Sequence, residues 1–287
     1  MCTRLLAVVA LFLLPWAVLA QEKTYTVKLK SFSDVGKSLK ATDRWKMRFD
    51  VRVIDPQGNV AFENTGTETR ETVYTETTLE VKEDGKRTRY QKAYSQASET
   101  KMGKEETLPY AKRTVVWELK DGKYVASVQG KPDLPQKVLE KLSRDAKEDS
   151  FDKIMMPKKA VAVGGTWSID PSAAARVFGY DKDFIKEGSR GQGKLLKVVE
   201  KDGKAWGTME FVLEFKVKSI GDLKFDAPAP VTFKIGLEAF IDGSSSTGKM
   251  SAIITISGKA TMEQGGMKFT LEMKMNGEGT LDQSETK

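Results

Sequence analysis

Residues 209–218 read MEFVLEFKVK, and this short run decides the fold. Its large apolar side chains fall on the odd-numbered positions, while charged side chains occupy most of the even-numbered ones. An alternation of period two places the two sets on opposite faces of a strand, one facing the core and one facing water. The run therefore predicts a half-buried β-strand.

The same alternation returns three more times before Leu281. The four apolar rows are Met209, Phe211, Leu213, Phe215 and Val217; Val231, Phe233, Ile235, Leu237, Ala239 and Ile241; Met250, Ala252, Ile254, Ile256, Ala260 and Met262; and Met267, Phe269, Leu271, Met273 and Met275. Four long strands joined by short turns form an antiparallel meander with one apolar face. Strands of this length twist and curl, so we expect a bent sheet, a half-barrel or a barrel.

The N-terminal half shows the alternation in shorter segments. Strands are predicted at residues 25–29, 44–53, 63–81, 87–97, 115–119 and 124–128, with a polar loop at 31–41. The pairs Asp121-Gly122 and Asp202-Gly203 each stand between alternating runs, which is the strongest short signal for a tight hairpin. The chain is therefore predicted to be mainly antiparallel β on both sides of its middle.

The middle of the chain has helical signals. Asp133 is followed by Gln136 with Pro135 between them, a capping pattern that opens an amphipathic helix. A second helix is predicted to begin at Asp170 and to end at Gly179. The expected organisation is a signal peptide at 1–20, an N-terminal antiparallel β region at 21–130, a helical insertion and connector at 131–190, and a C-terminal antiparallel meander at 191–287.

The first twenty residues predict export. Arg4 precedes an apolar run from Leu5 to Leu14, and Val18-Leu19-Ala20 resembles a signal-peptidase site. The run is too short for a comfortable membrane span and no later stretch is long enough, so we expect no integral membrane segment after cleavage. Cys2 precedes the apolar run, so the exported chain is expected in the periplasm or outside the cell, without a lipid anchor and without disulfides.

Charge and composition narrow the chemistry. Cleavage of the predicted signal peptide removes Arg4 and lowers the formal net charge from +7 to +6. Because basic and acidic residues are interleaved along the chain, we expect no nucleic-acid partner. The sequence contains no histidine, which excludes Ser-His-Asp and Cys-His nucleophile systems and histidine-based metal sites. We assign no catalytic residue, metal ligand or cofactor. A carboxylate-dependent hydrolase stays open, although no pair of carboxylates stands out among the 40 acidic residues.

The segment from Met156 to Trp167 reads MPKKAVAVGGTW. It resembles a signature, proline followed by basic residues and then Val-x-Val-Gly-x-Thr-Trp, of an uncharacterised family of secreted bacterial β-rich proteins. Met156 and Gly165 depart from the leucine and the acidic residue usual in that family. The resemblance implies an exported, β-rich protein and no particular activity.

Three hypotheses about function follow. The first is a non-enzymatic cell-envelope protein with a structural role or a protein partner. The second is a carrier of lipid or another apolar ligand, because methionines are concentrated in the C-terminal rows and thioethers adapt to irregular apolar partners. The residues expected to line the concave face of the C-terminal sheet in that case are Met209, Phe211, Leu213, Phe215, Phe233, Met267, Phe269 and Met273. The third is the carboxylate-dependent hydrolase.

Overall fold

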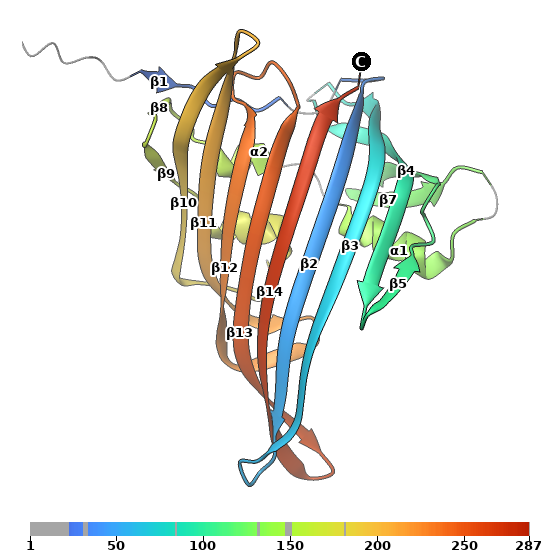
Figure 1. The fold of residues 1–287 in the computed structure, drawn as a ribbon, viewed down its shortest axis with the longest axis vertical. Coiled ribbons are helices and arrows are strands. Elements are labelled where there is room, and N and C mark those ends of the chain that lie inside the picture. The colour runs from blue at the N-terminus through green and yellow to red at the C-terminus, as the bar shows by residue number, and fades with distance from the viewer. Residues whose placement is uncertain are drawn as a thin grey trace, which may run out of the picture.

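A computed structural model describes residues 23–30, 34–83, 85–130, 133–146, 151–180 and 182–286. Most of the described chain belongs to one antiparallel sheet of twelve strands (Figure 1). The predicted signal peptide lies outside the described residues. No helix within the described ranges has the length and apolarity that a membrane span requires.

The strand order joins the two halves of the chain. From one edge to the other the strands are β7 (Lys123–Val128), β6 (Thr114–Lys120), β4 (Arg87–Lys101), β3 (Val60–Val81), β2 (Ser38–Ile54), β14 (Met267–Glu285), β13 (Gly248–Gln264), β12 (Leu223–Phe240), β11 (Lys204–Ile220), β10 (Phe184–Lys201) and β9 (Thr166–Ser168), and β5 (Lys104–Thr107) pairs with β4. The pairing of β2 with β14 makes one sheet from both halves. The sheet is open among the described residues, so of the predicted shapes the bent sheet and the half-barrel fit and the closed barrel does not.

The predicted C-terminal meander is confirmed as β11 to β14, and all four apolar rows lie on one face. We call this the inner face of the sheet, the face that carries Trp45, Met209 and Met273. Both Asp-Gly hairpins are confirmed as well. Asp121, Gly122, Asp202 and Gly203 all have positive φ, as the tight turn of a two-residue hairpin requires.

Three details of the N-terminal half differ from the prediction. The sequence predicted a polar loop that included residues 38–41, but these residues begin β2. They join the strand because Leu39 and Ala41 alternate in phase with Trp45 and are buried. Of the predicted strand at 25–29 only β1 (Thr24–Tyr25) forms, paired with β8 (Val161–Ala162), and Lys28 makes a single bridge to Asp242. The other predicted strands correspond to β3, β4, β6 and β7, each of which extends past the predicted limits at one end or both.

The helices lie in the middle of the chain, as predicted. Helix α1 (Gln136–Asp145) starts after Pro135, which occupies the cap position without a side-chain hydrogen bond, so Asp133 is not the cap. Helix α3 (Pro171–Val177) is capped as predicted, with Asp170 accepting a hydrogen bond from the backbone N–H of Ser172. Helix α2 (Phe151–Met155) was not predicted, since it is very short. Strand β10 begins at Phe184, within the segment 131–190 predicted as helical insertion and connector, and its register shifts between Ile185 and Arg190.

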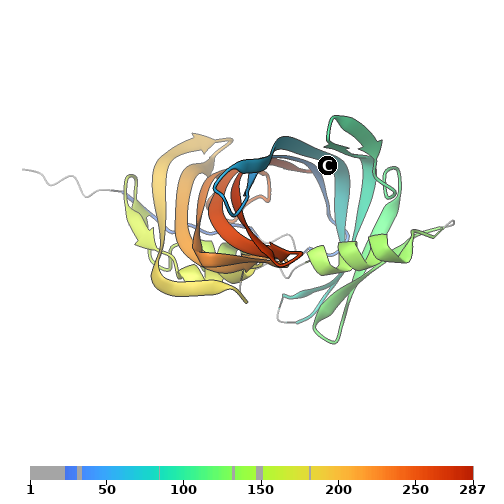
Figure 2. The same cartoon turned by 90° about the horizontal axis from the view of Figure 1, so that it is seen from below.

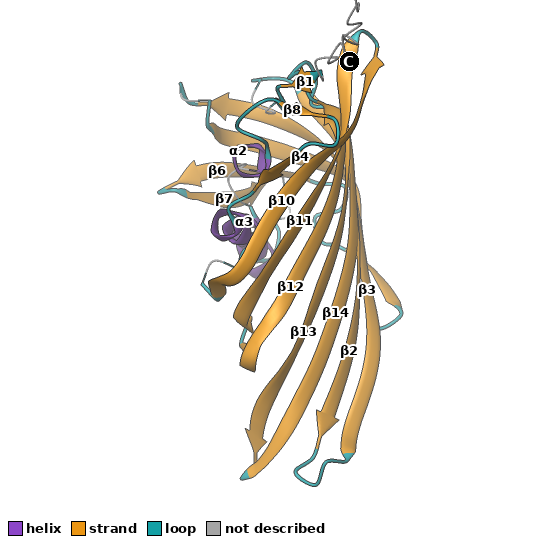
Figure 3. Cartoon of the chain, turned by 90° about the vertical axis from the view of Figure 1, so that its left-hand side faces the viewer, coloured by secondary structure: helices purple, strands orange, loops and turns teal. Residues whose placement is uncertain are grey.

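The helices cover the inner face only at the two ends of the sheet (Figure 2). The segment that contains α2 and α3 packs on β10 to β13 and closes a C-terminal core around Phe211. Helix α1 packs on β4, β6 and β7 and closes a separate N-terminal core around Trp117. Between these cores the long central strands β2, β3, β13 and β14 extend well past the helices (Figure 3).

Glycines allow aromatic rings to lie flat on the inner face. A side chain at Gly277 or Gly279 would collide with the Trp45 ring, and one at Gly66 would collide with Phe49. In the same way Gly193 makes room for Trp167, its register partner on β9. Each ring therefore rests on the backbone of the neighbouring strand, which is a common reason for glycine inside a strand.

Replacement of Gly193 by alanine tests this packing. The added methyl group would displace the Trp167 ring, and we expect a loss of about 1–3 kcal/mol in the free energy of unfolding. Gly236→Ala is the matched control, because the new methyl group meets only the rotatable hydroxyl of Ser251. Chemical denaturation should show the control within about 0.5 kcal/mol of the wild type. Equal losses in the two variants would contradict the packing described.

Candidate functional site

The structure divides the eight residues predicted to line an apolar site. Met209, Phe211, Leu213, Phe215 and Phe233 are buried in the C-terminal core. Met267, Phe269 and Met273 lie in the first part of β14 and outside the C-terminal core. Phe269 and Met273 are half-buried, and Met267 is 53% exposed. The two groups do not form one lining.

Side chains from the middle of the chain occupy the concave face of the C-terminal sheet. Phe151 and Trp167 each pack edge-on against Phe211, with ring centroids 5.9 Å apart. Phe178 stacks on Phe233 at 4.4 Å. The indole N–H of Trp167 donates to the carbonyl of Met155 at 2.7 Å, which fastens α2 to β9. The protein thus covers this face with its own aromatic residues.

The middle of the inner face has a different character. Its apolar side chains on β2 and β14 are all half-buried, and we call them the central strip: Trp45, Met47, Phe49, Val51, Val53, Phe269, Leu271, Met273 and Met275. Most of the strip belongs to neither core. Phe62, Met262 and Met267 continue it at the far end, where they are 54%, 37% and 53% exposed. A contiguous, partly exposed apolar surface of this kind is typical of a binding site.

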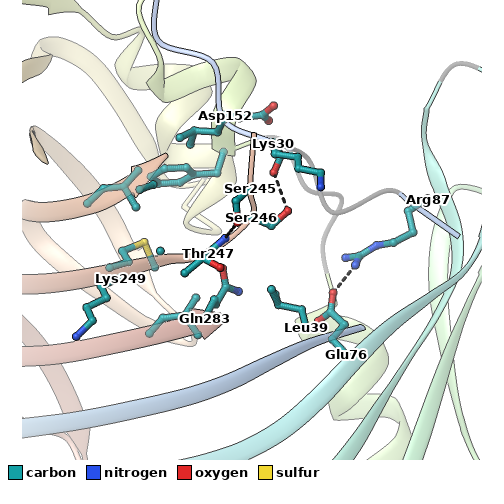
Figure 4. Close-up of a pocket in the computed structure, with 17 residues that line it drawn as sticks. Lys30, Leu39, Glu76, Arg87, Asp152, Ser245, Ser246, Thr247, Lys249 and Gln283 are labelled. Carbon is teal, nitrogen blue, oxygen red and sulfur yellow. Dashed lines mark hydrogen bonds and ion pairs between the residues drawn. The ribbon is translucent and has the colours of Figure 1, made fainter. Parts of the chain in front are cut away.

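A cavity of about 290 Å³ lies at the opposite end of the strip, between the two cores (Figure 4). Leu39, Leu237, Met250 and Leu281 contribute apolar walls. Leu281 is the next inward residue of β14 after Gly279, on which Trp45 rests, so the strip leads into this cavity.

The polar wall of the cavity contains a buried ion cluster. Glu76 on β3 contacts the Arg87 guanidinium, as Figure 4 shows, and accepts from the Lys92 ammonium at 3.2 Å. The side chains of Glu76, Arg87 and Lys92 are 12%, 16% and 24% exposed. Lys92 also lies 4.3 Å from the centroid of the Tyr74 ring, a cation–π contact. The cluster ties β3 to β4 where the N-terminal core meets the cavity.

The ion pairs control the protonation of the cluster. Burial alone would raise the pKa of Glu76, but Lys92 and Arg87 together lower it below its ordinary value of 4.5. Burial would likewise lower the pKa of Lys92, yet Glu76 and the neighbouring tyrosines raise it well above its usual value. Both groups are therefore charged at neutral pH.

The sequence analysis did not single out these inward charges. The strand predicted at 63–81 has many threonines and glutamates and few apolar residues, so its alternation does not show which side chains face inward. The alternation Tyr90, Lys92, Tyr94 was the available signal, since it places a lysine between two aromatic residues on one face. Within the described residues no group of three or more acidic, histidine or cysteine side chains is arranged to hold a metal ion.

These features define an open β-sheet protein with long strands. Helices cover the two ends of its inner face, and the apolar central strip between them has no covering helix among the described residues.

The chain matches no family model and no curated protein. Among solved structures the chain is similar to an engineered protein studied for asymmetric conductivity, with a TM-score of 0.18. The identity is 10%, and the match covers 86% of this chain and 100% of the other. The toluene transporter TodX of P. putida has the same TM-score, with 8% identity over 90% of this chain and 93% of the transporter. A mutant Rh. blastica porin has it too, with 11% identity over 85% of this chain and 100% of the porin. A likeness this loose supports no conclusion about fold or function.

Replacement of Glu76 by glutamine tests the ion cluster. The change leaves the buried Lys92 ammonium without its carboxylate, and we expect the free energy of unfolding to fall by about 3–5 kcal/mol. The matched control is Glu80→Gln, which removes an exposed pair with Arg89 between the same two strands and should cost less than about 1 kcal/mol. Chemical denaturation at neutral pH measures both.

The pH dependence supplies a second readout. A carboxylate with a lowered folded pKa stabilises the protein fully above its ordinary value, here 4.5, and loses that contribution as the pH falls through the folded pKa. The stability gap between wild type and Glu76→Gln should thus be constant above this value and shrink below it. A gap that widens in acid would contradict the assignment.

Proposed function

We propose that this chain is an exported, non-enzymatic binding protein that holds an extended apolar ligand, such as a hydrocarbon chain, on the central strip. The observation that carries the proposal is the half-buried apolar surface between two separately closed cores. Export rests on the pattern of residues 1–20 and is part of the proposal.

The shape of the strip favours a long, thin ligand. From Trp45 to Val53 the strip covers eight residue steps along β2, or about 26 Å at roughly 3.3 Å per residue. Trp45 and Phe49 lie flat over glycines, so they form a smooth floor and do not stand up to meet another protein layer. The methionines on both strands give this floor adaptable side chains.

The chemistry of the strip favours binding over catalysis. Its nine residues are aliphatic, aromatic or thioether side chains, which offer neither an acid or base nor a nucleophile. We therefore prefer a carrier to the carboxylate-dependent hydrolase. A partner protein is the competing occupant of the strip, and the experiment that follows separates the two.

The experiment compares charge on the two faces of one strand. Met273 faces inward within the strip and Asn276 faces outward, so Met273→Glu and Asn276→Glu add the same charge to opposite faces of β14. A carboxylate beside a bound hydrocarbon is unfavourable, and we expect Met273→Glu to weaken binding of the fluorescent probe N-phenyl-1-naphthylamine by at least roughly tenfold. Asn276→Glu should bind like the wild type. Phe211 is unsuitable for this test because it is fully buried in the core.

Native mass spectrometry of the purified protein gives an independent readout. We expect a co-purifying lipid in the wild type that is depleted in Met273→Glu and retained in Asn276→Glu. A wild-type protein that binds neither the probe nor any lipid would overturn the carrier function and leave the strip to a protein partner. Equal loss in both variants would show that binding occurs elsewhere.

A further inference from the structure

One charged residue interrupts the apolar side chains on the inner face of β2, between Trp45 and the buried Ala41. Trp45 belongs to the central strip, and the next inward residue toward the N-terminus is Asp43. The register partner of Trp45 on β3 is Arg70, which lies beside Asp43. A hollow of about 230 Å³ adjoins Trp45, Met47 and Arg70 at this border. The strip therefore ends against charged side chains at this point.

Beyond the border a second, larger cavity of about 510 Å³ lies between the sheet and α1. Its volume is in the range of pockets that hold small molecules. Helix α1 is fixed above it, because the Trp117 indole donates to the carbonyl of Leu142 at 3.1 Å and the Ser143 hydroxyl accepts from the backbone N–H of Ala126 at 2.8 Å. We call this the polar cavity.

On the sheet side of the polar cavity the charges are paired with one another, while Lys137, Lys141 and Asp145 of α1 line the opposite side. Lys92 is committed to Glu76 at 3.2 Å. Arg70 and Asp43 attract one another at 3.9 Å, a separation that leaves both with capacity for hydrogen bonds to another group. Burial raises the pKa of Asp43 even though Arg70 and Lys92 lower it, which indicates a carboxylate that is short of polar contacts. A charged group placed against Asp43 and Arg70 would disturb this pair, whereas a neutral one would not.

Aromatic rings form another part of the cavity wall. Tyr94 packs on Tyr110 with centroids 4.7 Å apart, and Tyr90 stacks on Trp117 at 5.1 Å. Rings with polar tips present apolar faces and hydroxyl groups to the same space. Such walls suit a ligand that is itself a ring with polar substituents.

We propose that the polar cavity receives the head group of the same ligand whose chain lies on the central strip, and that this head group is uncharged and rich in hydroxyls, as a sugar is. A hydroxyl can donate to the Asp43 carboxylate and accept from the Arg70 guanidinium at once, which no simple cation or anion can do. The inference rests on the proposed function, because it assigns the other end of that ligand.

The test uses three amphiphiles with the same alkyl chain, each below its micellar concentration. Dodecyl maltoside has a neutral sugar head, dodecyl sulfate an anionic head and dodecyltrimethylammonium a cationic head. Competition against N-phenyl-1-naphthylamine should show the maltoside binding roughly tenfold more tightly than either charged amphiphile. The shared chain makes the head group the only variable.

Two variants locate the head group. Asp43→Asn, which removes a half-buried charge without changing shape, should lower the affinity for dodecyl maltoside by roughly tenfold and leave the binding of N-phenyl-1-naphthylamine unchanged. Asp50→Asn is the matched control, since Asp50 is on the outer face of the same strand, bonded to Thr65. Tyr110→Ala gives a second perturbation of the cavity wall and should also weaken the maltoside selectively.

The possible results separate the two proposals. Equal binding of the three amphiphiles, a preference for a charged head, or an Asp43→Asn variant that keeps full maltoside affinity would overturn the head-group inference while the apolar strip stands. No binding of any amphiphile or of N-phenyl-1-naphthylamine would overturn the proposed function and the inference together.

Discussion

The pairing of β2 with β14 is the constraint on which the rest of the structure depends. Its register is continuous from Ile54 opposite Thr270 to Leu39 opposite Glu285, so strands from the two ends of the chain lie side by side. Each is paired on its other side as well, β2 with β3 and β14 with β13. Backbone hydrogen bonds therefore hold the middle of the sheet, and its inner face does not need a covering helix to keep its shape.

This arrangement separates stability from binding. Apolar burial is concentrated in the two cores, each closed by its own helices and aromatic residues. The central strip contributes little to either core, so its side chains can remain available to a ligand. The ion cluster of Glu76, Arg87 and Lys92 links β3 to β4 between the cavity and the N-terminal core.

The sequence predicted the local structure well because alternation is a local signal. The rows from Met209 to Met275, the Asp-Gly turns and the Asp170 cap each depend on residues close together in the chain. The partnership of β2 and β14 depends on residues more than two hundred positions apart, and no local pattern specifies it. The sequence likewise could not show that Phe151 and Trp167 would cover Phe211 and leave Met273 outside the core.

The methionines in the central strip and at its far end have a chemical consequence. Met262 and Met267 are exposed and Met273 is half-buried, whereas Met209 is fully enclosed in the C-terminal core. Peroxide converts an accessible thioether to a polar sulfoxide and spares one that solvent cannot reach. Oxidative stress would thus make the inner face more polar at these methionines while the enclosed core is spared. Reductase repair of the sulfoxides would restore the apolar surface.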